Sequence, residues 1–379
     1  MPFSTGTPAA GISAPLVDAG RGSEADFERL GERVGNAFVL IETDELQDVS
    51  GLFAEYASAS EIEPRAVARG AAGVVYVGSR SRNVLYRHNA SAGPRTDRPM
   101  LVMERDAGLR ALRLIRDGRA LELWVTLELE RGPTYESENV IGEIRGSENP
   151  EEIVVIGAHL DSWDLGTGAL DNGCNVALVI DVARQISRLG LRPRRTIRFA
   201  LFNGEEQGMN GSWGYVKTHR DELDQHVMAS SYDIGSGRIT GFFTGGRPQL
   251  VAKVASALTA VRDLGPFQHV DAPIVGTDNF DFMMEGIANL VANQDSANYG
   301  PNYHARTDTF DAVDQRQLRL NAAIAAAVTW GFAEMEFDWP RQSREQIEAL
   351  IAGTDLQAQM SMMGLWDPWK RGERGRGRE

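Results

Sequence analysis

The sequence predicts an α/β protein with a mostly parallel mixed sheet that carries helices on both faces, together with a smaller α/β domain. Two observations lead to this fold class. Strand-like apolar runs alternate with helical patterns along most of the chain, and the helical patterns place their apolar residues on one stripe. The chain has 379 residues, of which 42% are hydrophobic, and this length suits two domains.

The first part, residues 1–130, reads as the smaller domain. Residues 1–22 are rich in Gly, Pro, Ser and Ala and predict irregular or loosely strand-forming structure. The apolar runs that follow predict strands at 37–43, 73–77, 99–103 and 121–127. Helical patterns between them predict short helices at 58–71 and 106–114.

The second part, residues 131–340, predicts the larger sheet. Apolar runs indicate strands at 153–158, 196–202, 227–232 and 287–292. Long amphipathic patterns indicate helices at 175–189, 249–264 and 314–334. In the tail, 341–379, a helix is expected at 343–351, and the Gly- and Arg-rich remainder predicts a largely disordered segment.

Composition excludes several classes of function. The net charge of −14 argues against nucleic-acid binding, which requires clustered Lys and Arg. The single cysteine, Cys174, excludes an intramolecular disulfide and a thiolate zinc site. No apolar run reaches the length of about 18 residues that a membrane span needs. Residues 1–8 lack the features of a secretory signal, so the sequence taken at face value predicts a cytoplasmic protein.

Polar side chains follow the predicted strands of the second part at the points where these strands end. His159 follows the first strand, Glu205 and Glu206 follow the second, and Asp233 follows the third. In open α/β sheets, ligands bind beyond the carboxyl ends of the strands. Imidazoles and carboxylates at such positions are costly to bury unless a partner or a metal satisfies them. We therefore expect a metal site at this edge.

Five residues are candidate ligands for a pair of divalent ions: His159, Asp171, Glu206, Asp233 and His304. Without thiolates, zinc must be held by His and carboxylates, the ligand set of catalytic sites, although cobalt or manganese would suit similar ligands. Three carboxylates against two Zn²⁺ leave a formal charge of +4 − 3 = +1. Two such ions can activate a water and polarise an amide carbonyl together.

Glu205 is the candidate general base. Adjacent residues on an extended chain point in opposite directions, so one glutamate can coordinate while its neighbour faces the water. The alternative is a solvated pair at a helix N-terminus. Asp161 is placed to accept the second N–H of His159 and to fix its tautomer. Asp308 and Asp311 are expected to cap the following segment, and the remaining histidines (His88, His219, His226 and His269) are expected to be structural.

Six short motifs occur along the chain: GAHLDSWD at 157–164, GALDNG at 168–173, GEEQG at 204–208, YDIG at 232–235, GTD at 276–278 and HARTDT at 304–309. Over roughly 130–338 the chain resembles the M28 family of zinc peptidases, and is most similar to its carboxypeptidase Q (plasma glutamate carboxypeptidase) branch. Residues 1–130 resemble the protease-associated (PA) domain of that branch.

The resemblance implies a role for each candidate. Asp171 would bridge two zinc ions. His159 and Asp233 would complete the ligand set of one ion, and Glu206 and His304 would complete that of the other. Glu205 would act as the base. A cis peptide is implied at Asp171–Asn172. From the resemblance, the chain is expected to begin inside the PA-like domain, and it has Cys174 and Asn175 where the family favours small residues such as Ala and Gly.

The expected function is that of a co-catalytic dizinc exopeptidase acting on dipeptides or short peptides with a free terminus. A zinc amidohydrolase or aminoacylase acting on N-acyl amino acids would use the same site. A non-catalytic scaffold with a peptidase fold is a third alternative, and metal content would distinguish it. The resemblance also implies a homodimer, and a secreted or periplasmic location if a leader is missing from this chain.

Overall fold

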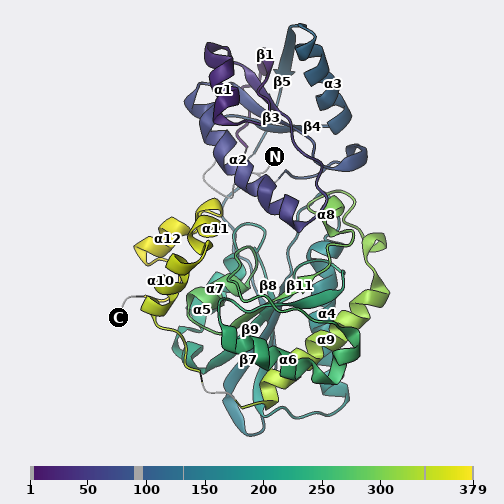
Figure 1. Ribbon diagram of the computed structural model, residues 1–379, viewed down its shortest axis with the longest axis vertical. Coiled ribbons are helices and arrows are strands. Elements are labelled where there is room, and N and C mark those ends of the chain that lie inside the picture. Colours follow the sequence, from purple (N-terminus) through teal and green to yellow (C-terminus); the bar gives the residue numbers. More distant parts are fainter. Residues whose placement is uncertain (1–3, 89–96, 131, 337–338, 378–379) are drawn as a thin grey trace. The chain divides into compact units, whose positions relative to one another are not determined.

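The chain folds into two compact units. The computed structural model describes residues 4–88, 97–130, 132–336 and 339–377 (Figure 1). The N-terminal unit comprises Met1–Tyr135 and Gly300–Thr307, and the C-terminal unit comprises Glu136–Tyr299 and Asp308–Glu379. The sequence assigns 300–307 to the second part, whereas in the structure this segment groups with the first.

The N-terminal unit contains a five-stranded sheet in the order β4-β3-β2-β1-β5. Its first four strands run parallel, and the fifth pairs antiparallel with the first. The strands are β1 (Ile12–Asp18), β2 (Phe38–Ile41), β3 (Gly73–Val77), β4 (Met100–Met103) and β5 (Leu121–Val125). β1 lies within the segment that was expected to be irregular or loosely strand-forming, and it pairs with both β2 and β5.

Helices cover both faces of this sheet, since alternate residues of a strand point to opposite sides. Val39 and Ile41 face α1 (Glu24–Leu30) and α2 (Val49–Ala68), while Phe38 and Leu40 face α3 (Arg105–Arg116). α2 begins nine residues before the predicted start, because the Asp48 side chain caps it by accepting the N–H of Gly51 at 2.8 Å.

The C-terminal unit contains a six-stranded mixed sheet in the order β10-β11-β9-β7-β8-β6. The four central strands are parallel, and the two edge strands pair antiparallel with their neighbours. The strands are β6 (Val140–Ile144), β7 (Asn149–His159), β8 (Arg195–Phe202), β9 (His226–Ser231), β10 (Ile239–Phe243) and β11 (Asn289–Gln294). The central four are those that the apolar runs predict. The edge strands β6 and β10 were missed.

Helices also lie on both faces of the larger sheet, as the sequence predicts (Figure 1). One face of β7, with Val154 and Ile156, packs on α4 (Cys174–Arg188), α6 (Pro248–Ala257) and α9 (Gln315–Glu334). The other face, with Ile153 and Val155, packs on α5 (Asn210–Thr218) and α7 (Asn279–Met284). The short helix α8 (Tyr299–Asn302) lies where the chain passes from one unit to the other.

The C-terminal segment differs in part from the expectation: a helix forms where one is predicted at 343–351, but further helices follow it where a largely disordered tail was expected. It forms α10 (Arg344–Gly353), α11 (Leu356–Met362) and α12 (Trp366–Arg371). Each helix is short, but each buries apolar residues in one shared cluster with α7. Such a cluster is invisible to a search for long periodic patterns, because no single helix supplies more than a few of its members.

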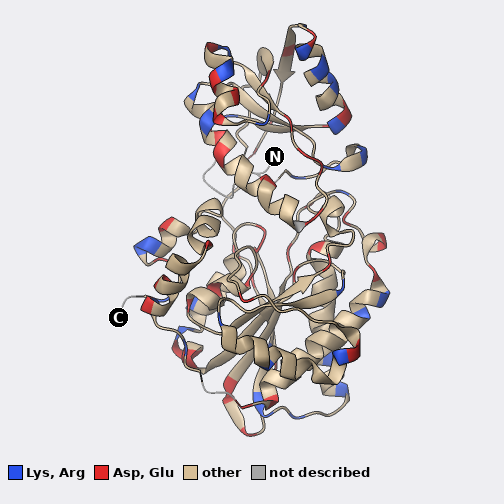
Figure 2. Cartoon of the chain, viewed as in Figure 1, with Lys and Arg blue, Asp and Glu red and all other residues tan. Residues whose placement is uncertain are grey.

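Charged residues are unevenly distributed between the strands and the loops of the C-terminal unit. The charged residues of the four central strands of the C-terminal unit lie in the first halves of β7 and β8 (Glu151, Glu152, Arg195 and Arg198). Figure 2 shows acidic residues in loops of the same unit. In the part of the chain that the structure describes, no helix is long and apolar enough to cross a membrane.

Candidate metal centre

The register of two parallel strands brings His159 level with Asp233. β7 pairs with β9 so that Gly157 lies opposite Ser231. His159 and Asp233 come two residues later on their respective chains, and a step of two returns a side chain to the same side of a strand. The Nε2 atom of His159 accordingly lies 2.9 Å from Oδ1 of Asp233.

Asp171 reaches the same point from the turn Ala169–Gly173, which leads into α4. Its Oδ1 atom lies 3.2 Å from Nε2 of His159. The Asp171–Asn172 peptide is cis, in agreement with the resemblance. The Asn172 side chain donates a 2.9 Å hydrogen bond to the carbonyl of Tyr232, which links this turn to the end of β9.

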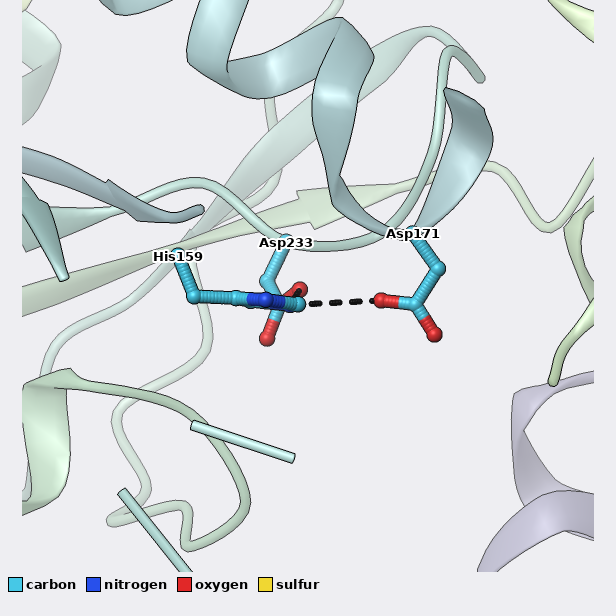
Figure 3. A group of neighbouring side chains, drawn as sticks. All are labelled: His159, Asp171 and Asp233. Carbon is cyan, nitrogen blue, oxygen red and sulfur yellow. Dashed lines mark hydrogen bonds and ion pairs between the residues drawn. The ribbon is translucent and has the colours of Figure 1, made fainter. Parts of the chain in front are cut away.

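His159, Asp171 and Asp233 together form a buried set of metal-ligand atoms (Figure 3). One ligand atom from each residue lies within 4.8 Å of the other two. An imidazole nitrogen with carboxylate oxygens is the donor set of catalytic zinc sites. The three residues therefore fit a divalent metal ion.

The pKa values of these groups depend on their burial and on one another's charges. Burial alone would lower the pKa of His159, but the carboxylates of Asp233, Asp161 and Asp171 raise this pKa well above its ordinary value. Burial raises the pKa of Asp233 to about 6. A cation between these side chains would stabilise the ionised carboxylates and the neutral imidazole, which are the forms that bind metal.

Glu205 and Glu206 lie in the turn between β8 and α5. A carboxylate oxygen of Glu206 lies within 4.8 Å of a carboxylate oxygen of Asp171, so Glu206 approaches the site from a third strand end. Burial raises the pKa of Glu205 well above its ordinary value, and the negative charges of Asp233, Glu206 and Asp278 add to this effect, against the lowering influence of His159. A glutamate in such surroundings can hold a proton near neutral pH.

Asp161 differs from its expected role. The Nδ1 atom of His159 lies 2.9 Å from the main-chain carbonyl oxygen of Asp161 and 3.7 Å from its carboxylate. The carbonyl group is therefore the hydrogen-bond partner of the ring. The carboxylate instead accepts the backbone N–H groups of Glu205 at 3.1 Å and Glu206 at 3.2 Å.

His304 belongs to the N-terminal unit through the segment 300–307. Its carbonyl oxygen accepts the backbone N–H of Arg87 at 2.8 Å, and its Nδ1 lies 3.4 Å from the Arg87 guanidinium. The neighbouring Ala305 forms a β-bridge with Tyr86. The role of His304 as a metal ligand stays a prediction.

Two further acidic residues of the centre were not assigned from the sequence. Asp308, which was expected to cap the following segment, accepts the N–H groups of Leu170 at 2.6 Å and Asp171 at 3.1 Å. Asp278 is fully buried, and this burial raises its pKa to about 7. The GTD motif at 276–278 was the only sequence signal for Asp278, because a lone aspartate before a helix is ordinarily a cap.

A family model, curated relatives and a solved structure all relate this chain to one family of peptidases. The model of peptidase family M28 matches residues 139–329, about half of the chain. Carboxypeptidase Q from Rattus norvegicus is 32% identical over 232 residues, which cover 60% of this chain and 48% of that protein. The chain thus spans about half the length of these curated relatives.

Two further relatives extend the similarity over most of the chain. The probable lipoprotein aminopeptidase LpqL from Mycobacterium tuberculosis is 26% identical, over 86% of this chain and 69% of that protein. The crystal structure of a peptidase M28 precursor from Shewanella amazonensis SB2B superposes with a TM-score of 0.81 at 28% identity, covering 90% of this chain and 79% of that one.

Proposed function

Because the chain belongs to peptidase family M28, we propose that it is a metal-dependent exopeptidase that hydrolyses dipeptides or short peptides with a free terminus. The observation that carries this proposal is the buried group of His159, Asp171 and Asp233 at the carboxyl ends of the strands. Several ionisable groups buried at one point are costly to keep charged, and a bound cation would offset the repulsion between their carboxylates.

The metal of this proposal is zinc, with two ions per chain. His159, Asp171 and Asp233 would hold the first ion, and Asp171, Glu206 and His304 would hold the second. When bound, the ions supply Lewis-acid polarisation of the scissile carbonyl and lower the pKa of water. The donor types support zinc, because the site has imidazole and carboxylate ligands and the only thiol of the chain, Cys174, has a pKa raised by burial.

Glu205 would carry the proton in this reaction. Its carboxylate takes the proton from the attacking water and delivers it to the nitrogen of the leaving amine, so that one proton is transferred twice. Burial and neighbouring carboxylates raise the pKa of Glu205 above its ordinary value, so its carboxylate is a stronger base than that of an exposed glutamate. Asp161 supports this role by holding the backbone of Glu205 and Glu206.

The enzyme of this proposal recognises either the free amine or the free carboxylate of its substrate. One relative bears the name of a carboxypeptidase and another that of an aminopeptidase. A substrate panel answers this directly: Ala-Ala, its N-acetyl derivative and its C-terminal amide, each assayed with zinc restored. Loss of cleavage on acetylation indicates recognition of the amine, and loss on amidation indicates recognition of the carboxylate. Release of acetate, rather than of alanine, from the acetylated compound would favour an aminoacylase instead.

The decisive variants separate metal binding from chemistry. Glu205→Gln should retain zinc and lose a factor of about 10² to 10⁴ in kcat, because the proton carrier is gone. His159→Ala should lose zinc measured by mass spectrometry, because a ligand is removed. A wild-type protein that binds no zinc, or a Glu205→Gln variant with normal kcat, would contradict the proposal.

A further inference from the structure

The turn that carries Glu205 and Glu206 closes on itself. The carbonyl oxygen of Glu205 accepts the N–H groups of both Gly208 and Met209 at 2.8 Å. Met209 has a φ of +57°, in the left-handed region that residues other than glycine seldom adopt. A turn with this geometry needs outside contacts that hold it.

Arg374, far along the chain in the segment after α12, makes contacts of this kind. Its guanidinium donates to the carbonyl oxygens of Gly208 at 3.0 Å and Met209 at 3.2 Å. The same group forms two 2.7 Å hydrogen bonds with the two carboxylate oxygens of Asp281 in α7. The guanidinium thus joins the turn to a helix on the same face of the sheet.

This ion pair is buried and well satisfied. Arg374 is 6% exposed, and Asp281 is 1% exposed. The guanidinium carbon lies 5.1 Å from the ring centre of Trp213 and 5.3 Å from that of Phe280. The planar fork of arginine can bond a carboxylate with two N–H groups and still donate to carbonyl groups, which a lysine ammonium cannot do in the same geometry.

A second observation ties the same turn to the C-terminal segment. The Met209 side chain is 1% exposed and belongs to the apolar cluster that α7 shares with α10, α11 and α12. The carbonyl group of Met209 therefore bonds to a residue after 340, and its side chain packs against residues after 340.

We infer that Arg374 is a positioning residue of the proposed reaction, acting through the turn 204–209 on the carboxylates of Glu205 and Glu206. This inference rests on the proposed function. Asp161 holds the N–H groups of the two glutamates, and Arg374 holds the carbonyl groups at the other end of the turn. The C-terminal segment is in this way part of the catalytic apparatus, although none of its side chains needs to touch the substrate.

The test compares Arg374→Lys and Arg374→Gln with the wild-type chain at saturating zinc. Displacement of a catalytic group by about 1 Å can cost a factor of about 10² in rate. We expect kcat per zinc-loaded folded molecule to fall about tenfold in Arg374→Lys and about 100-fold in Arg374→Gln. KM should stay within about twofold in both, because the variants remove no substrate contact.

A double variant and a control keep the result interpretable. Asp281→Asn combined with Arg374→Gln removes the whole buried ion pair, so no charge is left unpaired if the single variant fails to fold. It should show the same loss of kcat. Arg371→Gln is the control, because the exposed Arg371 pairs with Glu373 at the surface, and this variant should leave kcat unchanged.

Wild-type kcat in folded Arg374→Lys and in the double variant would overturn the inference. A loss of activity that only tracks the fraction of unfolded protein would also overturn it, because the role would then be structural. Glu205→Gln is measured in parallel. If that variant is inactive while the Arg374 variants are fully active, only the inference fails, whereas an active Glu205→Gln would refute the proposed function itself.

Discussion

Asp161 shows how a residue type can be recognised while its task is misjudged. Its position two residues after His159 suggested a carboxylate-to-imidazole hydrogen bond. In the structure the main-chain carbonyl makes that contact, and the carboxylate holds the N–H groups of Glu205 and Glu206. An aspartate has two acceptors, its main-chain carbonyl group and its carboxylate. The direction of the chain after the strand determines which of them faces the imidazole of His159, and this direction depends on the neighbouring turn.

The variant Asp161→Asn tests this assignment. An asparagine keeps one carbonyl acceptor but replaces the other oxygen by an NH₂ group, which would face an N–H donor. We expect kcat to fall by about ten- to 100-fold with KM little changed, since the turn of Glu205 shifts. Steady-state kinetics at saturating zinc measures this.

Asp164→Asn is the matched control, because Asp164 is exposed in the same loop and should behave as wild type. Equal kinetics for the Asp161 and Asp164 variants would argue against the positioning role of Asp161.

At the scale of elements, α4 illustrates what an amphipathic pattern can and cannot establish. The spacing of Val176, Val179, Ile180, Ala183 and Ile186 predicts one buried stripe. In the structure Val179 and Ile186 are buried and Val176 and Ala183 are partly buried, while the buried face also includes Leu178 and Val182. Ile180, also apolar, is 52% exposed. The pattern therefore identifies the buried face, while single apolar residues beside it require the structure.

The same Ile-to-Ala substitution at a buried and at an exposed position of α4 should change the free energy of unfolding by different amounts. Ile186→Ala removes a side chain that is 3% exposed and should lower the free energy of unfolding by about 2–5 kcal/mol, because a cavity forms in the core. Ile180→Ala should change it by less than about 0.5 kcal/mol. Urea unfolding monitored by circular dichroism compares the two, and similar losses would show that the packing of α4 is misjudged.

At the scale of the whole molecule, the two units differ in how they use buried acids. In the C-terminal unit, Asp171 and Asp233 lie in the proposed metal centre, whereas Asp281 pairs with Arg374. In the N-terminal unit, Glu63 of α2 lies 6% exposed beside Tyr76 of β3, whose hydroxyl donates to it at 3.3 Å. Burial raises the pKa of Glu63 from its ordinary 4.5 to about 7.

This pKa predicts a pH dependence of stability with a definite sign. The folded chain holds the Glu63 proton more tightly than the unfolded chain, so raising the pH from about 4.5 to above 7 lowers the free energy of unfolding. The shift corresponds to about 3 kcal/mol. Glu63→Gln should lose this contribution, and urea unfolding at pH 5 and pH 8 measures the difference from wild type.

Glu61→Gln provides the control on the same helix, because Glu61 is exposed and pairs with Arg65 at the surface. It should keep the wild-type pH dependence. An unchanged dependence in Glu63→Gln would mean that Glu63 is ionised in the folded chain.

The sequence alone determined the central strands of the larger sheet, the long helices between them and the polar residues at the strand ends. These are local properties, because apolar periodicity and residue type at a strand end can be read within a short window. Parallel neighbours share one edge, so His159, Asp171, Asp233 and Glu206 could be expected to gather there, and the structure places them together.

Only the tertiary structure decided the remaining features. It moved 300–307 into the N-terminal unit, turned the carboxylate of Asp161 toward the glutamate turn, and inserted Arg374 beside Asp281, 93 residues away in the sequence. Each of these features depends on a contact between segments that are distant in the sequence. Such a contact produces no recognisable pattern in the sequence of either segment. Residue patterns therefore locate the chemistry, while packing determines which side chains hold it in place.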